Sequence, residues 1–457
     1  MAQHPEAARG YDVNVATGPE RPARVSWQLH EEGADDHAAP RIFHAALAPD
    51  GSLQVQEEGP SPVAQFVDVL HQQVGLPFDH EISMPIMGAI SLLYAIAIVS
   101  GVIVLLPSLV SDLFAMRVGR NVKRMWLDLH NLLGVCSLPF HLIMALTAVV
   151  FAFHDQFYAA QELTFSRPEM EQARPAGGPQ APLAPKGDPL QPAEVLRRVE
   201  RQAPGFRVQT ISYAKRPTGE AALRITGDDP RYGLRAPTYG VAQADAYTGE
   251  LTGTDYMPGH QDGWGATITS FFSLHFGSFG GLPVRWAYFL LGIAGAFIFY
   301  TGNLLWIESR RKRERKAGAV EQTRSTRILA ALTVGVPLGC VAGISVTIAA
   351  AKPLGLSATE GLHSAIYYAV FLAFTGWALL RGSARAGVEL LPVAAAGTAL
   401  VPLASIAFAA GHPPVVPLVD VTAAIIAAGI MWTWRYTLRR SRSGPRDSVW
   451  SVQQAAA

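Results

Sequence analysis

The chain has 457 residues, of which 49% are apolar and only 16% are charged. This balance excludes an ordinary soluble domain of the same size and predicts a polytopic membrane protein. The formal net charge of +1 does not indicate any class of partner, because the basic residues cluster next to the apolar runs. No nucleic-acid-binding pattern is present, so we expect membrane lipid, and no nucleic acid, among the partners.

Seven runs with at most one charged residue are long enough to cross the hydrocarbon core as helices, which rise about 1.5 Å per residue. In chain order they are residues 84–107, 131–153, 286–307, 328–351, 364–380, 390–410 and 415–434. We therefore predict an α-helical membrane protein with about seven transmembrane helices, accompanied by small α+β modules outside the membrane.

Clusters of Arg and Lys set the orientation of these helices through the positive-inside rule. They follow the first, third, fifth and seventh runs, at residues 117–124, 308–316 (ESRRKRERK), 381–385 and 434–446 (WRYTLRRSRSGPR). These loops and the C-terminus are predicted to be cytoplasmic. The segments 1–83 and 155–284 then lie on the outer side, with the short loops at 352–363 and 411–414.

The second outer segment opens with a Pro- and Gly-rich linker, RPAGGPQAPLAPKGDPLQP, which we do not expect to pack. An α+β module follows, because PAEVLRRVERQAPG has helical spacing and FRVQTISYA, AALRITG and TYGVAQADAYTGELTG predict strands. The predicted divisions are an outer segment with an incomplete module at 1–83, two membrane helices at 84–154, the linker and module at 155–284, the third helix and basic loop at 285–327, a four-helix block at 328–434 and a tail at 435–457.

Three landmarks recur at nearly one spacing and indicate an internal duplication. Gly51, His71 and the Ser100-Gly101 pair correspond to Gly249, His275 and the Thr301-Gly302 pair, which follow 198, 204 and 201 residues later. The second copy begins with the histidine-bearing run at 131–153, and the first copy has no such run. We therefore expect a further helix upstream of the given start, missing through a misplaced start codon or through loss of the helix.

Two histidines mark the second apolar run. His130 and His141 are eleven residues apart, so an unbroken helix would place them on one face, about 16 Å apart along its axis. Same-face histidines at two depths can ligate b-type haem with partners from neighbouring helices. The alternatives are hydrogen bonds between helices or, for His130, a place at the wet interface. His71 and His275 occupy equivalent places in the two copies, whereas His363 is assigned to an outer loop.

The stretches WLDLHNLLGVCSLPFHLIMALT, DAYTGEL and SLHFGSFGGLPVRWAYFLLGIAGAFIFYTGNLLW resemble the PepSY-associated transmembrane proteins of bacterial inner membranes. That family includes ferrisiderophore reductases, and the likeness runs from about residue 45 to about residue 310. It departs from the family pattern at Thr147-Ala148, where Thr-Gly is usual.

The resemblance implies a haem-b electron-transfer protein with periplasmic PepSY modules, one of them incomplete. His130 matches the histidine of DLHNxLG, His141 that of LPFH, and His71 and His275 the LH positions before the paired helices. It therefore implies one or two haem b groups with these four histidines as iron ligands.

The leading hypothesis is an inner-membrane ferric or ferrisiderophore reductase. Electrons from a quinol or another donor would pass through b haems to iron(III) at the periplasmic side. No GxGxxG follows a strand, so we expect no direct binding of NAD(P)H or flavin. The rival hypothesis is a binding or regulatory membrane protein whose PepSY modules contact a periplasmic protease or peptidoglycan and move no electrons. A transporter is a third alternative, but the sequence offers neither a broken-helix pair nor an intramembrane charge cluster for it.

Overall fold

The structure is a computed structural model. It describes residues 4–18, 21–29, 40–58, 61–108, 122–164, 187–216, 219–236, 239–318, 322–355, 358–408, 417–444 and 448–452. Outside these ranges lie the loop residues Arg117 and Arg120, the linker at 174–186 and the loop at 411–414. The chain divides into two compact units. One comprises Met1–Pro60, Leu76–Gly101 and Pro139–Gly292, and the other comprises Ser61–Gly75, Val102–Leu138 and Ile293–Ala457.

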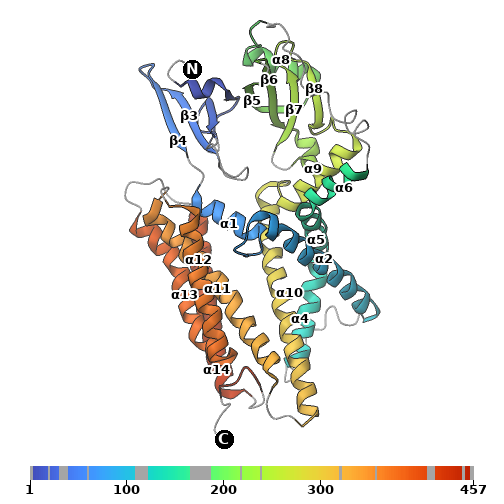
Figure 1. Cartoon of the computed structure of the whole chain (residues 1–457), viewed down its shortest axis with the longest axis vertical. Helices are drawn as coiled ribbons and strands as arrows, with labels where there is room; N and C mark the ends of the chain where they lie inside the picture. Colours follow the sequence, from blue (N-terminus) through green and yellow to red (C-terminus); the bar gives the residue numbers. More distant parts are fainter. Residues whose placement is uncertain are drawn as a thin grey trace. The chain divides into compact units, whose positions relative to one another are not determined.

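One antiparallel sheet of eight strands, in the described part of the first unit, joins both outer segments. The strands are β1 (Gly10–Asn14), β2 (Val25–Leu29), β3 (Arg41–Leu47), β4 (Leu53–Glu58), β5 (Arg207–Lys215), β6 (Ala221–Asp228), β7 (Gly240–Asp245) and β8 (Leu251–Tyr256). Their order is β4-β3-β2-β1-β5-β6-β7-β8, with the first four blue and the last four green in Figure 1. The strands predicted at 206–214, 221–227 and 238–253 are confirmed as β5, β6 and the β7–β8 hairpin.

The sheet is built from two equivalent halves that meet at β1 and β5. Asp12 of β1 lies opposite Ser212 of β5, and the two positions are 200 residues apart in the chain. Each half is a four-stranded meander that runs outward from this pair. The strand order is therefore symmetric about the junction, in agreement with the predicted duplication.

A short amphipathic helix covers the apolar face of the second half. It is α8 (Pro192–Gln202), which begins with proline, where the missing amide hydrogen costs nothing. Its Val195 and Val199 are fully buried against Ile211 and Ile225 of the sheet. The predicted helix at 192–205 is thus confirmed.

Several shorter helices and 3-10 turns complete the described part of the chain. They are α1 (Pro62–Gln72), α6 (His154–Thr164), α9 (Gly263–Phe276) and the 3-10 turns η1 (Pro5–Ala8), η2 (Leu106–Ser108) and η3 (Pro230–Arg235). In both halves a hairpin is followed by a helix that carries a histidine in its last turn, α1 or α9, and then by a long apolar helix. This repeated order again follows the predicted duplication.

Six helices within the described ranges are long and apolar enough to cross a membrane. They are α2 (His80–Leu105), α10 (Gly281–Lys316), α11 (Arg324–Leu354), α12 (Glu360–Arg381), α13 (Ser383–Ala407) and α14 (Pro417–Ser443). α4 (Val122–Cys136) and α5 (Leu138–Ala152) provide a seventh span if they are counted together. The chain is a multi-pass α-helical membrane protein that carries an antiparallel sheet, as the sequence predicted.

The second predicted span is not one continuous helix. It breaks at Ser137, between α4 and α5. Pro139 has no amide hydrogen to donate to the carbonyl of Val135, so one helix hydrogen bond is lost at this point and a break is favoured. The inference that His130 and His141 share one helix face required an unbroken helix and is therefore wrong. The chain thus contains a broken helix pair, contrary to the prediction that it has none.

Small residues bring α11 and α12 close together in the second unit. A Cβ atom on Gly335 would lie 2.7 Å from the Cβ of Ala378, and one on Gly343 would lie 2.8 Å from the ring of Tyr367. Such contacts allow helix backbones to approach closely in a membrane. The same face of α12 receives α1, because Phe66 and Leu70 pack on Tyr367.

The junction of the two half-sheets gives a direct test of the fold. We expect the double variant Asp12→Cys with Ser212→Cys to form a disulfide, because these residues face each other on paired strands. The natural cysteines, Cys136 and Cys340, are replaced by serine, and mass spectrometry of the digested protein detects the cross-link.

Asp12→Cys with Thr226→Cys is the matched control, since β6 lies two strands from β1, about 9.5 Å away, beyond disulfide reach. Cross-linking of the control pair but not of the junction pair would contradict the sheet order.

Candidate functional site

His141 is a buried imidazole with an unsatisfied nitrogen. It lies in the first turn of α5, is 5% exposed, and its Nε2 has no hydrogen-bond partner among the described residues. Aromatic rings surround it edge-on, with Tyr94 of α2 at 6.1 Å and Phe140 at 5.1 Å between centroids. A buried polar atom without a partner costs free energy, so this nitrogen is suited to a ligand.

His275 is held by a threonine from a neighbouring helix. Its Nδ1 lies 2.8 Å from the Oγ1 of Thr147 on α5. The Thr147 hydroxyl donates its one proton to the carbonyl oxygen of Ile143, 2.7 Å away. The hydroxyl oxygen therefore accepts a hydrogen bond from Nδ1–H, which leaves the lone pair of the neutral ring on Nε2.

The helix that carries His275 is fixed at both ends. Asp262 caps its start by accepting a hydrogen bond from the Gly265 amide at 2.6 Å. It ends at Gly277, whose left-handed backbone (φ 59°) suits glycine and places His275 in the last turn. The ring of Phe151 meets the imidazole edge-on at 4.9 Å.

The turn η3 supports α9. The buried Asp229 carboxylate accepts hydrogen bonds from the Arg231 guanidinium, and these bonds hold the pKa of Asp229 below its usual value. Directly after η3, the carbonyl of Ala236 accepts a hydrogen bond from the hydroxyl of Ser273, two residues before His275. The position of this histidine therefore depends on a segment outside the membrane helices.

His130 repeats the threonine arrangement in the second unit. Its Nδ1 lies 3.0 Å from the Oγ1 of the fully buried Thr301 on α10. The Thr301 hydroxyl donates to the carbonyl oxygen of Phe297 at 2.7 Å, so Nδ1–H again donates and Nε2 again keeps the lone pair. The neighbouring Gly302 has no side chain, and a Cβ there would lie 3.7 Å from the ring.

His71 differs from the other three candidates. It is exposed in the last turn of α1, and no side-chain partner is recorded for it among the described residues. No described contact joins His71 to His130 in the second unit, or His141 to His275 in the first. The structure thus supplies three partly or fully buried imidazoles and one exposed one.

The assignment of His363 to an outer loop is wrong. It lies on α12, is 0% exposed and stacks on Phe66 of α1 at 6.3 Å. Both of its ring nitrogens lack a partner among the described residues. The predicted span began after the charge of Glu360, whereas the helix starts there with Thr359 as its cap. Thr359 followed by Glu360 is a typical helix start, and this signal could have placed His363 on the helix.

The donor set favours a ligand that needs few protein atoms. Within the described ranges no three His, Cys, Asp or Glu side chains converge as they would around a bare metal ion. A haem iron takes at most two axial ligands from the protein, and an oriented Nε2 lone pair is a suitable one. His130, His141 and His275 fit this role, and the exposed His71 has no comparable support from its surroundings.

Comparison with known proteins identifies one family. The family model described as PepSY-associated TM region matches residues 2–309, which includes both half-sheets and the helices that carry the four candidate histidines. A search of curated proteins gives no match.

The threonine contacts predict a defined tautomer for His130. We expect its resonances in ¹⁵N NMR of the purified protein to report a protonated Nδ1, with Nε2 unprotonated. Thr301→Val removes the hydroxyl at nearly constant volume, so protonation at Nε2 should become populated.

Thr301→Ser is the matched control because it keeps the hydroxyl and should keep the wild-type tautomer. An unchanged tautomer in Thr301→Val would contradict the assigned hydrogen bond.

Proposed function

Because the chain belongs to the family of the PepSY-associated TM region, we propose that it is a membrane electron-transfer protein that holds haem b. It reduces ferric iron or a ferric siderophore on the outer side of the membrane. The observation that carries this proposal is the pair of threonine hydroxyls that orient His130 and His275 with Nε2 as the lone-pair nitrogen.

The surroundings of these residues suit a haem ligand. Ligating histidines commonly donate their second ring nitrogen to a fixed acceptor, and Thr147 and Thr301 are such acceptors. His141 adds a buried Nε2 without a protein partner. Bound haem b supplies reversible one-electron chemistry at its iron.

The protein's own residues orient the histidine rings and shield them from water. Threonines fix the ring planes of His130 and His275, and aromatic rings such as Phe151 and Tyr94 keep water from the imidazoles. Because the rings are already oriented before ligation, little reorganisation accompanies a change of charge at the site. Apolar helices around them provide the low-dielectric surroundings that tune a redox potential.

Charge placement supports an orientation with the sheet on the periplasmic side of a bacterial inner membrane. The last turn of α10 contains Arg313, Arg315 and Lys316, and that of α14 contains Arg440 and Arg442. The positive-inside rule assigns these ends to the cytoplasm. Each half-sheet precedes its membrane helix, α2 or α10, in the chain, whereas the basic cluster follows that helix. Both half-sheets are therefore assigned to the periplasm.

Reduction of the iron explains its release. Oxygen ligands of a siderophore hold hard iron(III) much more strongly than iron(II), so transfer of one electron weakens the complex. A quinol donor that is oxidised to quinone yields two electrons and two protons, enough for two ferric ions. Neither step requires a carboxylate acid/base pair.

A regulatory membrane protein is the second candidate function. It is favoured by the sheet itself, because none of the four candidate histidines lies on any of its described strands. The sheet modules would then contact a periplasmic protease or peptidoglycan without electron transfer.

An absorption measurement separates the two functions. We expect the full chain, expressed with haem supplied and purified in detergent, to show the reduced-minus-oxidised bands of bis-imidazole haem b. His141→Ala should remove at least half of this signal and abolish ferric-siderophore reduction by the dithionite-reduced protein.

His154→Ala is the control, since His154 is an exposed histidine just beyond the end of the same helix. A folded, colourless protein, or bands that persist in His130→Ala, His141→Ala and His275→Ala alike, would favour the regulatory function.

A further inference from the structure

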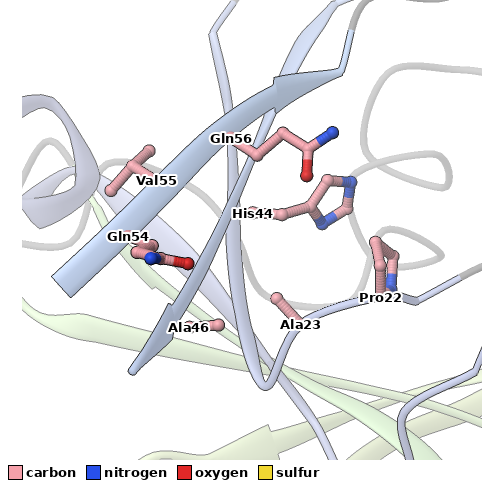
Figure 2. Close-up of a pocket in the computed structure, with 7 residues that line it drawn as sticks. All are labelled: Pro22, Ala23, His44, Ala46, Gln54, Val55 and Gln56. Atoms are coloured by element: carbon pink, nitrogen blue, oxygen red, sulfur yellow. The ribbon is translucent and has the colours of Figure 1, made fainter. Parts of the chain in front are cut away.

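The first half-sheet contains a cavity of about 400 Å³ whose lining includes none of the four candidate haem ligands. Figure 2 shows its lining, which comes from β3, β4 and the segment before β2. The lining residues are Pro22, Ala23, His44, Ala46, Gln54, Val55 and Gln56. A volume in this range holds a small organic molecule.

His44 provides one unused hydrogen-bonding atom in this cavity. It is 9% exposed, and its Nε2 lies 2.9 Å from the Oε2 of Glu58. The carboxylate accepts from Nε2–H, so Nδ1 of the neutral ring is a hydrogen-bond acceptor. This Nδ1 is buried and has no partner among the described residues. The site therefore lacks one donor, which a bound molecule can supply.

Two carboxamides lie on the same face of the sheet as His44. Gln56 is directly opposite His44, and Gln54 is directly opposite Ala46. Alternation along β4 places both glutamines on one face, and in Figure 2 the Gln56 amide lies beside the His44 ring while Val55 points away. No hydrogen bond recorded in the described part of the chain uses either carboxamide, so each has donors and an acceptor to offer.

On the described strands of the second half-sheet, the His44 and Gln56 pair is not repeated. One row crosses the whole sheet in register, and it reads Gln56, His44, Ser26, Asp12, Ser212, Arg224, Gln243 and Gly253. By the symmetry of the two halves, Gln243 and Gly253 take the places of His44 and Gln56. Glycine has no side chain to line a cavity, so the polar pair occurs in the first half alone.

We propose that this cavity binds a secondary amide group, –CO–NH–, of a small uncharged molecule. The amide N–H donates to Nδ1 of His44, and the amide carbonyl accepts from the carboxamide NH₂ of Gln56 or Gln54. Pro22, Ala23 and Ala46 leave room for the small apolar groups that flank such an amide. This inference stands independently of the proposed electron transfer.

The lining chemistry favours an amide over an ion. None of the lining residues carries a formal charge when His44 is neutral, so neither an anion nor a carboxylate finds a countercharge there. One imidazole nitrogen with two amide oxygens is a weak set for a transition metal. Two common sources present the required group: an extended peptide and an N-acetylated sugar.

The test uses the full chain in detergent with two probes. N-acetyl-alanine-N′-methylamide represents the peptide source and N-acetylglucosamine represents the sugar source. Saturation-transfer NMR and titration should detect binding of at least one probe, and the probe that binds identifies the source. Glucose, which lacks the amide, should bind at least about tenfold more weakly, the equivalent of one lost hydrogen bond.

Variants locate the binding. Gln56→Leu and Gln54→Leu change exposed side chains on an edge strand. At least one of these two variants should bind the probe about tenfold more weakly than wild type. Gln243→Leu is the control, because Gln243 is an exposed glutamine of the second half, at the position equivalent to His44, and its loss should leave binding unchanged.

Three results would overturn the proposal: binding of neither probe, equal binding by Gln54→Leu, Gln56→Leu and wild type, or stoichiometric Zn²⁺ binding that shifts the His44 resonances while neither probe does. None of these results bears on the presence of haem.

Discussion

A threonine hydroxyl can donate only one hydrogen bond. The tautomers of His275 and His130 therefore depend on which acceptor receives the proton of Thr147 and of Thr301. Both donate it to a backbone carbonyl four residues earlier on their own helix. Their oxygens can then only accept from the facing histidines, His275 and His130. A side chain that merely satisfies its own helix backbone thus fixes the tautomer of an imidazole on another helix. The lone pair of each ring is left on the nitrogen that a haem iron would use.

The pairing of the two half-sheets reduces the number of unpaired strand edges. Two meanders of four strands would each have two unpaired edges, which attract other strands. Pairing β1 with β5 removes one edge from each half. Asp12 faces Ser212 at the centre of this pair, so the joint forms between equivalent positions of the two copies. The two halves differ in side chains, because Gln243 and Gly253 of the second half stand where the first half has His44 and Gln56.

Most of the fold follows from local sequence patterns. Apolar length identified six membrane helices, and alternation with turn residues identified the strands from 206 onward. The pairing of β1 with β5 was not predictable, because it joins segments about 200 residues apart that have no local signal for each other. The break at Ser137 was readable in principle from Pro139, but the uninterrupted apolar run outweighed it.

The site was predictable as a set of residues but not as a geometry. Sequence motifs named all four histidines, and they also marked Thr147 and the Thr301-Gly302 pair without giving them a role. The hydrogen bonds that give these threonines a role span 128 and 171 residues. The Thr359 cap could have placed His363 on a helix, but its burial by α1, which lies almost 300 residues earlier in the chain, cannot be inferred from the sequence around it.

The proposed function requires that imidazole nitrogens of His130, His141 and His275 ligate haem iron. Low-temperature electron paramagnetic resonance of the oxidised full chain reports the axial ligands of such an iron. We expect a low-spin ferric signal from two imidazole ligands that shifts toward high spin in His141→Gln and is unchanged in His154→Gln. A haem-loaded protein whose low-spin signal survives in His130→Gln, His141→Gln and His275→Gln, or a folded protein that takes up no haem, would contradict it.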